Sequence, residues 1–212
     1  MAVAEGRDIA GTINRLLGLP FCVKVATRDC HPIDHVSFAT SHQAPDNKPF
    51  ESRVKIANPD DAAESCEIRV WPPHCVQGSR GAEIIPELDV AKFDHIVNKG
   101  RDKRVEALSG FADVFGRRNT EAIDVDLTSL LRSHQITDVY VVGLAGDYCV
   151  RSTAIDAREA GFEVFLIEDG IRSIDPGRDG WQAAVRQMQE DGIHIVKVQG
   201  QEVMRVQNLD TA

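Results

Sequence analysis

Residues 138–160 read DVYVVGLAGDYCVRSTAIDAREA and carry the clearest fold signal in the chain. The first seven residues are largely apolar and β-branched, which is typical of a strand buried on both faces of a parallel sheet. From Tyr148 to Ala160 apolar residues recur at helical spacing, and Gly161 provides a helix stop. The stretch therefore predicts a buried strand, a tight turn that carries Cys149, and a helix.

The same alternation continues on both sides of this stretch. Four further runs predict buried strands: 21–27, 93–98, 162–167 and 193–198. Three further runs show helical spacing: 5–17, 127–134 and 180–190. Strands that alternate with helices predict an α/β fold of three layers, with an open, mainly parallel sheet and helices on both of its faces. We expect one domain over residues 1–212.

The segment 40–67 interrupts this alternation. It is polar, contains Pro45, Pro49 and Pro59, and shows no clear period. A long irregular excursion in a compact domain is usually a functional loop, and we expect such a loop here.

Composition limits the class of protein. Of the 212 residues 42% are hydrophobic and 27% charged, which are ordinary globular values. No run is apolar enough to span a membrane and no secretion signal is visible, so we expect a soluble cytoplasmic protein, with nucleus or peroxisome open in a eukaryote. A net charge of -9 with scattered basic residues argues against nucleic-acid or membrane partners. Five cysteines without paired spacing argue against a disulfide framework.

Chemically reactive residues follow three of the predicted strands. Asp29, His31 and His35 come after the strand at 21–27, Lys99 after 93–98, and Cys149 after 138–144. Ligands of open α/β sheets bind outside the carboxyl ends of the strands, so we expect these residues to meet at one edge.

The position of Cys149 suits a nucleophile. Backbone N–H groups at a helix N-terminus favour the thiolate and can also hold an oxyanion. A cation such as Lys99 would stabilise the thiolate further, and Gly100 lets the backbone turn directly after it. The alternatives are a small buried hydrophobe and an ordinary exposed lysine.

Asp29, His31 and His35 offer a carboxylate and two imidazoles within a short turn, and His74 follows a stiff Trp-Pro-Pro sequence. These ligand types suit zinc, iron or manganese and do not choose among them. The alternative is that the histidines cap turns. Cys75, beside His74, is expected to face the core.

Three separated motifs occur in a fixed order: TRDCHPIDHVSF at 27–38, WPPHCVQG at 71–78 and GLAGDYCV at 143–150. They resemble the TRDWHP-x-DH-x-SF, WPPHCVQG and GLATDYCV elements of nicotinamidases, which are isochorismatase-like cysteine hydrolases. Cys30 stands where the family has an aromatic residue, and Gly146 replaces the common Thr. The likeness runs from Val3 to about Asp175.

The resemblance implies hydrolysis of nicotinamide to nicotinate and ammonia in NAD salvage. Cys149 would attack the carboxamide carbon and form a thioester, with Lys99 as the second catalytic residue. The amides of Ala145 and Cys149 would form the oxyanion hole, after a cis peptide bond. The implied metal ligands are Asp29, His31 and His74, with His35 as an additional candidate, and the implied substrate-binding residues are Trp71, Ala145 and Tyr148.

The implied cofactor is a divalent metal that binds the pyridine nitrogen, and we expect zinc before iron or manganese. The expected partner is the small molecule nicotinamide. A homo-oligomer is compatible with the sequence.

The start of the chain departs from the family pattern. Family members open with a buried strand whose Asp serves as general base, whereas residues 1–8 resemble the segment after that strand. We therefore expect a chain that is truncated relative to the family. Two alternatives to an active nicotinamidase stay open. The first is a catalytically impaired protein, either a truncated remnant or a paralogue that binds a metal or ligand. The second is a cysteine amidohydrolase that acts on a carbamoyl or ureido substrate. Asp29 and His74 argue against the second, because those relatives generally lack the metal motifs.

Overall fold

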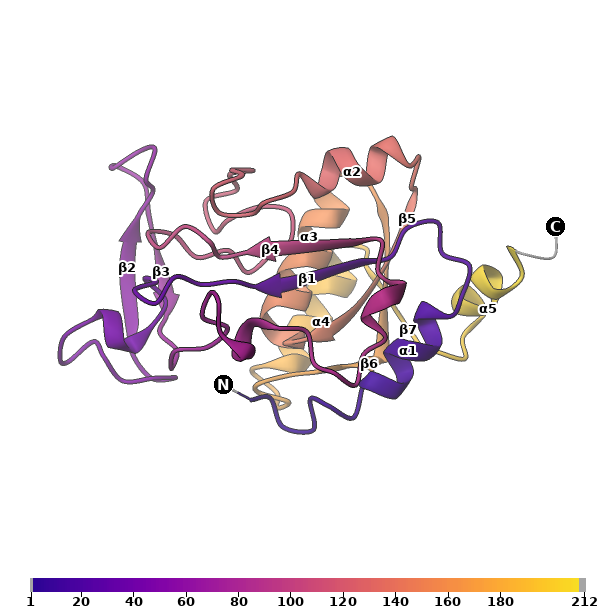
Figure 1. Ribbon diagram of the computed structural model, residues 1–212, viewed down its shortest axis with the longest axis horizontal. Helices are drawn as coiled ribbons and strands as arrows, with labels where there is room; N and C mark the ends of the chain where they lie inside the picture. Colours follow the sequence, from indigo (N-terminus) through magenta and orange to yellow (C-terminus); the bar gives the residue numbers. More distant parts are fainter. Residues whose placement is uncertain (1, 210–212) are drawn as a thin grey trace. The chain divides into compact units, whose positions relative to one another are not determined.

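The computed structural model describes residues 2–209, and the chain divides into two compact units. The first unit consists of residues 27–83 and 96–126. The second consists of residues 2–26, 84–95 and 127–209. Figure 1 shows the helices and strands of both. A single domain over the whole chain stays a prediction.

The second unit is built on a parallel sheet. Its strands are β5 (Asp138–Leu144), β6 (Glu163–Arg172) and β7 (His194–Val196), in that order across the sheet. β6 pairs in parallel with both neighbours, so that Leu166 lies opposite Val141 on one side and Ile195 on the other. Val164 and Leu166 of β6 are completely buried. This burial confirms the prediction of strands enclosed on both faces.

Helices cover both faces of this sheet (Figure 1). The helices of the second unit are α1 (Ala10–Leu17), α2 (Leu127–Ser133), α3 (Arg151–Glu159), α4 (Trp181–Glu190) and α5 (Gln201–Gln207). Leu16 of α1 and Val203 of α5 pack with Phe165 and Ile167 of β6 in one core cluster. Side chains alternate along a strand, so Val164 and Leu166 face the other side, where α3 contacts β6. The three-layer α/β prediction is therefore confirmed.

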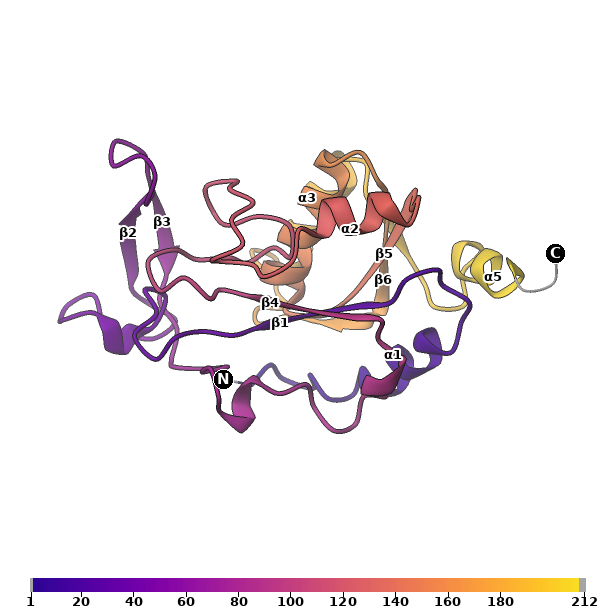
Figure 2. The same ribbon diagram turned by 45° about the horizontal axis from the view of Figure 1, so that its top comes forward.

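The first unit contains two pairs of strands. β1 (Val25–Asp29) is paired with β4 (His95–Lys99), and the two strands lie side by side in Figures 1 and 2. β2 (Arg53–Ala57) and β3 (Ser65–Arg69) form an antiparallel hairpin. The first residues of β1 and β4 belong to the second unit. Short 3-10 turns occupy Ala39–Ser41, Arg80–Ala82 and Val90–Lys92.

The prediction of an irregular loop over 40–67 is wrong in its second half, where the β2–β3 hairpin lies. Val54 and Ile56 are buried, and their neighbours along β2 are exposed. This alternation covers only five residues and is surrounded by polar sequence, so it gave no clear period. Helix α5 also lies in a part of the chain for which no element was predicted.

Several predicted boundaries move by a few residues. β1 ends at Asp29 instead of residue 27, and β4 ends at Lys99. Helix α1 begins at Ala10, because the preceding residues form a turn with Glu5 at φ 53°. No helix among residues 2–209 has the length and apolar character required to cross a membrane.

Candidate active site

Three predicted metal ligands lie together in the first unit. Asp29 is the last residue of β1, His31 follows it, and His74 comes from the segment after β3. The Asp29 Oδ2 atom lies 4.0 Å from His31 Nε2 and 3.8 Å from His74 Nε2. Two distant stretches of sequence thus supply one carboxylate and two imidazoles to one point.

Backbone hydrogen bonds bring the two stretches together. The His31 N–H donates to the Cys75 carbonyl at 3.0 Å, and the Gln77 N–H donates to the His31 carbonyl at 2.8 Å. This is a parallel bridge between His31 and Val76. Just before it, the Cys30 N–H donates to the Lys99 carbonyl at 2.9 Å, which joins the end of β1 to the end of β4. The strand ends therefore fix the spacing of the donors.

Both imidazoles are oriented by backbone carbonyls. His31 Nδ1 lies 2.9 Å from the Gly100 oxygen, and His74 Nδ1 lies 2.9 Å from the Pro72 oxygen. A carbonyl only accepts hydrogen bonds, so each Nδ1 carries a proton, and in the neutral tautomer of each ring the lone pair is on Nε2. In both cases the lone pair belongs to the atom nearest Asp29. Metal-binding histidines usually donate a hydrogen bond from the other ring nitrogen in this way, which fixes the orientation of the ring.

Gly100 makes the approach of His31 sterically feasible. Its φ is +66°, and a Cβ placed on it would lie 2.3 Å from His31 Cε1. No residue with a side chain fits this position without moving the imidazole. The glycine predicted for a turn therefore has a second role, which is to let the ring reach the backbone carbonyl.

Lys99 neutralises the carboxylate of the donor group. Its Nζ donates to Asp29 Oδ1 at 2.6 Å and to the Ala107 carbonyl at 3.0 Å, and the residue is only 3% exposed. Burial alone would raise the pKa of the Asp29 carboxyl, but the charge of Lys99 reverses this and holds the pKa well below its usual range. Burial lowers the pKa of His31. An ionised carboxylate beside a neutral His31 imidazole is the protonation state that a metal requires.

His35 occupies a different position from the other three. Its Nε2 lies 3.1 Å from the Val105 oxygen, while Nδ1 lies 2.8 Å from Ser37 Oγ and 3.2 Å from the Ser37 N–H. Burial lowers its pKa to about 4. His35 is not part of the Asp29–His31–His74 group, but with His31 and Glu106 it forms a second, buried group of side chains that could hold a metal ion. It packs against the His31 ring, with centroids 4.2 Å apart.

Glu106 was not predicted from the sequence. It is 4% exposed, and its carboxylate lies close to ring nitrogens of His31 and His35. Its Oε1 accepts the Ala107 N–H at 2.9 Å, and the Ala107 carbonyl in turn accepts Lys99. A single carboxylate within the otherwise uncharged run 105–111 was the signal that could have revealed it.

The donor set fits a divalent metal. One carboxylate oxygen and two imidazole nitrogens are a common three-residue set for zinc, iron or manganese. Their present separations of about 4 Å would shorten somewhat around an ion about 2.0–2.2 Å from each ligand. The Asp29, His31 and His74 side chains are therefore a possible metal-binding group.

Trp71 belongs to the first unit as well. It is 5% exposed, its N–H donates to the Ser37 carbonyl at 2.7 Å, and its ring meets Phe50 edge-to-face at 5.8 Å. The backbone bond ties Trp71 to the segment that contains His31 and His35. Its role as a wall for the substrate ring stays a prediction.

The predicted nucleophile lies in the second unit, at an unusual turn. β5 ends at Leu144, the Leu144–Ala145 peptide bond is cis, and Gly146–Val150 form a π-helical turn that leads into α3. The cis bond that the resemblance implied is therefore present. The Ala145 carbonyl accepts the N–H groups of Tyr148 and Val150, each at 3.1 Å. Cys149 is half-buried in this turn.

Two neighbours of Cys149 hold the turn in place. The Asp147 carboxylate is buried and accepts the N–H groups of Ile174 at 3.0 Å and Asp175 at 2.8 Å. A Cβ on Gly146 would lie 2.4 Å from Ser173 Oγ. The glycine that stands in place of the family's Thr is therefore packed too closely for any side chain without rearrangement.

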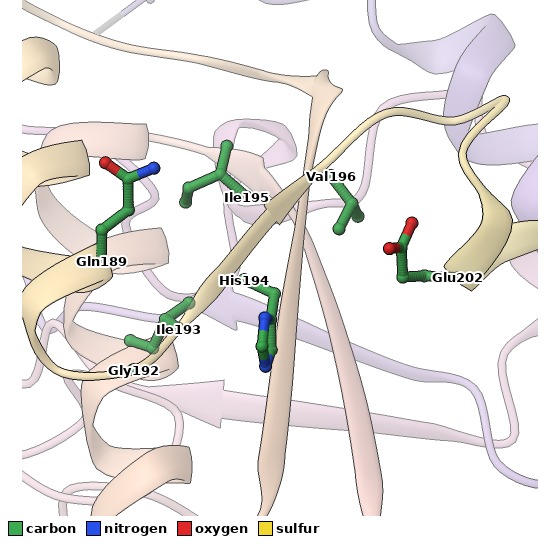
Figure 3. A pocket seen from close by; sticks show the side chains of 7 residues that line it. All are labelled: Gln189, Gly192, Ile193, His194, Ile195, Val196 and Glu202. Atoms are coloured by element: carbon green, nitrogen blue, oxygen red, sulfur yellow. The ribbon is translucent and has the colours of Figure 1, made fainter.

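A hollow beside β7 contains none of the predicted site residues (Figure 3). It lies within the second unit, and His194 at its edge is hydrogen-bonded to Glu163 at 2.5 Å. The lining residues are Gln189, Gly192, Ile193, His194, Ile195, Val196 and Glu202. Neither the metal-donor group nor the Cys149 turn contributes to it.

Comparison with known proteins places the chain in a family of hydrolases. Residues 25–200 match the isochorismatase domain, so the chain belongs to the isochorismatase-domain family. The nicotinamidase of Acinetobacter baylyi is 35% identical over 175 residues, which cover 82% of this chain and 74% of that protein. The nicotinamidase of Escherichia coli is 33% identical, with coverage of 82% and 76%.

Solved structures agree with this assignment. The yeast nicotinamidase Pnc1p bound to the inhibitor nicotinaldehyde has a TM-score of 0.83 and 28% identity, and covers 92% of this chain and 90% of its own. The pyrazinamidase of Pyrococcus horikoshii in complex with zinc has a TM-score of 0.68 and 32% identity, with coverage of 92% and 88%. The predicted fold and family are confirmed.

Proposed function

We propose that this chain is a nicotinamidase, which hydrolyses nicotinamide to nicotinate and ammonia in NAD salvage. The observation that carries the proposal is the Asp29–His31–His74 group, in which two imidazole Nε2 atoms and one carboxylate oxygen meet at one point. The nicotinamidase relatives at 33–35% identity support the same substrate. The two alternatives, an impaired paralogue and a hydrolase of carbamoyl or ureido compounds, are not favoured.

Asp29, His31 and His74 would hold the metal, and zinc is the ion we propose because a pyrazinamidase relative is in complex with it. A bound ion would supply a Lewis acid for the ring nitrogen of a flat substrate. Lys99 keeps Asp29 ionised through the 2.6 Å contact, and Gly100 and Pro72 keep the imidazoles in the ligand tautomer. His35 supports the His31 ring.

Cys149 is the proposed nucleophile. Its sulfur attacks the carboxamide carbon, the C–N bond breaks with release of ammonia, and water then hydrolyses the thioester to nicotinate. The backbone amides of Ala145 and Cys149 stabilise the oxyanion, and Trp71 and Tyr148 contact the substrate ring. Lys99 is the second proposed catalytic residue. A small molecule is thus the substrate, whereas homo-oligomerisation and a cytoplasmic location stay predictions.

The test is ammonia release from nicotinamide by the purified 212-residue chain loaded with zinc. We expect turnover, and none from Cys149→Ala with the same metal content. Release of ammonia from a ureido compound but not from nicotinamide would favour the other cysteine amidohydrolase. Metal analysis of the double variant Asp29→Ala, His74→Ala tests the ligand set, because stoichiometric zinc in that variant would refute it.

A further inference from the structure

Two cysteines are adjacent in sequence to all three donors of the metal group. Cys30 stands between Asp29 and His31, and Cys75 directly follows His74. Both residues are half-buried. Neither has a role in the proposed hydrolysis, which uses a different thiol.

The hydrogen bonds of the bridge bring the backbones of these two cysteines close together. His31 and Val76 form an isolated parallel bridge, and Cys30 and Cys75 each directly precede one of the two bridged residues. The bond from the His31 N–H to the Cys75 carbonyl, at 3.0 Å, directly joins their backbones. Adjacent paired strands are about 4.8 Å apart. That spacing lies within the Cα separation of about 4.4–6.8 Å that disulfides require.

The side chain of Cys30 is directed away from the donor group. Asp29 and His31 both contribute to that group, and strand alternation therefore places the residue between them on the other side. Cys75 lies at a turn with φ +46°, which frees its Cβ from the alternation of the chain before it. Alternation thus separates the Cys30 side chain from those of Asp29 and His31, so a bond at Cys30 Sγ would not take the place of a donor atom.

We propose that Cys30 and Cys75 are a disulfide-forming pair that fastens together the two segments of the metal-donor group. With hydrogen peroxide as oxidant, one thiol loses its proton and the thiolate attacks the peroxide, giving a sulfenic acid and a hydroxide that takes up that proton to become water. The second thiol then displaces the sulfenic oxygen as water. In sum, two thiols and one peroxide give one disulfide and two waters, with two electrons passed to the peroxide.

The consequence follows from the length of chain that the bond closes. The donor segments are already joined by the His31–Val76 and Phe38–Trp71 bridges and by the hydrogen bond from Gln77 to the Cys30 carbonyl. A cross-link between residues 30 and 75 would act mainly by restricting the unfolded chain. We therefore expect oxidation to raise the melting temperature of the metal-free protein by several degrees, and dithiothreitol to reverse the rise.

The experiment uses the full chain with Cys22→Ser, Cys66→Ser and Cys149→Ala, which leaves only Cys30 and Cys75. After treatment with peroxide, alkylation of the remaining thiols and tryptic digestion, mass spectrometry should detect one cross-linked peptide pair. The matched control carries Cys30→Ser in addition and should give none. The unsubstituted chain is digested in parallel, so that a folding defect of the multiple variant cannot hide the result.

Alkylation of both thiols after peroxide treatment would overturn the proposal, as would a disulfide found only between two molecules. A Cys30–Cys75 bond that lowers the melting temperature would also overturn it. None of these readouts depends on turnover of nicotinamide, so the outcome is independent of the proposed activity.

Discussion

The donor group around Asp29 and the turn around Cys149 differ in the atoms that fix them. In the first, side chains are held at their far ends: Lys99 binds the carboxylate, and a carbonyl binds each imidazole Nδ1. In the second, the main chain itself is fixed, through the Asp147 carboxylate and the close packing at Gly146. Substitutions in the donor group should therefore impair metal binding, whereas substitutions in the Cys149 turn should impair catalysis or stability.

The largest expected effect separates catalysis from metal binding. Cys149→Ala removes the proposed nucleophile and should lower kcat by about 10⁴-fold or more, since nucleophile deletions in hydrolases have effects of this order. Its zinc stoichiometry should match that of the parent, because no atom of the donor group changes. Ammonia release and metal analysis on the same preparation measure both quantities.

Cys22→Ala is the matched control, because Cys22 is an exposed cysteine of the second unit. It should leave both kcat and zinc content unchanged. Residual activity of Cys149→Ala above a hundredth of the parent would contradict the assignment of the nucleophile.

The second prediction concerns the charge inside the donor group. Asp29→Ala leaves the Lys99 ammonium buried without its carboxylate, which should lower the free energy of unfolding by about 3 kcal/mol and abolish tight zinc binding. Urea denaturation of the metal-free protein measures the first effect. Asp34→Ala breaks the exposed ion pair with Lys103 and should lower the free energy of unfolding by less than about 1 kcal/mol. Equal decreases in the free energy of unfolding for Asp29→Ala and Asp34→Ala would show that burial does not strengthen the Asp29–Lys99 ion pair.

The same contrast explains what the sequence could predict. Asp29 and His31 were recognised because ligand chemistry depends on residue type and short spacing, whereas His74 was assigned through the resemblance of the 71–78 motif to a known family. The structure brings the three together. Glu106 and the Gly100 carbonyl were missed because they reach His31 across about seventy residues. No local pattern records such a contact.

Backbone-built features were harder to predict. Periodicity placed a helix from Tyr148, whereas the chain first makes the π-helical turn Gly146–Val150. Hydrogen bonds from the backbone N–H groups of residues 174 and 175 to the Asp147 carboxylate support that turn, and such pairing is invisible in local periodicity. The first half of β6 was predicted well, because Val164 and Leu166 belong to a continuous apolar run. The prediction ended at residue 167, whereas β6 continues to Arg172, because Glu168 and Asp169 interrupt that run.

A third prediction uses pH, because His35 is a buried imidazole next to the donor group. Its pKa is lowered by burial to about 4, so between pH 6.5 and 4 the unfolded chain takes up a proton there that the folded chain does not. The free energy of unfolding of the metal-free protein should therefore fall by about 3 kcal/mol through this group as the pH drops across that window. Urea denaturation at several pH values measures the slope.

His35→Gln isolates this contribution from those of the carboxyl groups. The variant keeps a hydrogen-bonding side chain but cannot bind a proton in this range, so its stability should fall less steeply with acid. Parallel pH profiles for the variant and the parent would show that His35 does not carry the dependence.

The smallest effects, from adding one methyl group, compare the two regions most directly. Gly100→Ala places a Cβ 2.3 Å from His31 Cε1, and Gly146→Ala places one 2.4 Å from Ser173 Oγ. Each should lower the free energy of unfolding by about 1–3 kcal/mol through overpacking. Only Gly100→Ala should also weaken zinc binding, by about 10–100-fold, because it displaces a ligand from its supporting carbonyl.

Gly11→Ala serves as the control for the methyl group itself, since a Cβ there meets no atom within 4 Å and alanine favours the helix. It should leave zinc affinity unchanged and raise stability slightly. If Gly146→Ala weakened zinc binding as much as Gly100→Ala, the turn of Cys149 would have to contribute to the geometry of the donors. The two regions would then form one cooperative structure, and the separation of metal binding from catalysis would be lost.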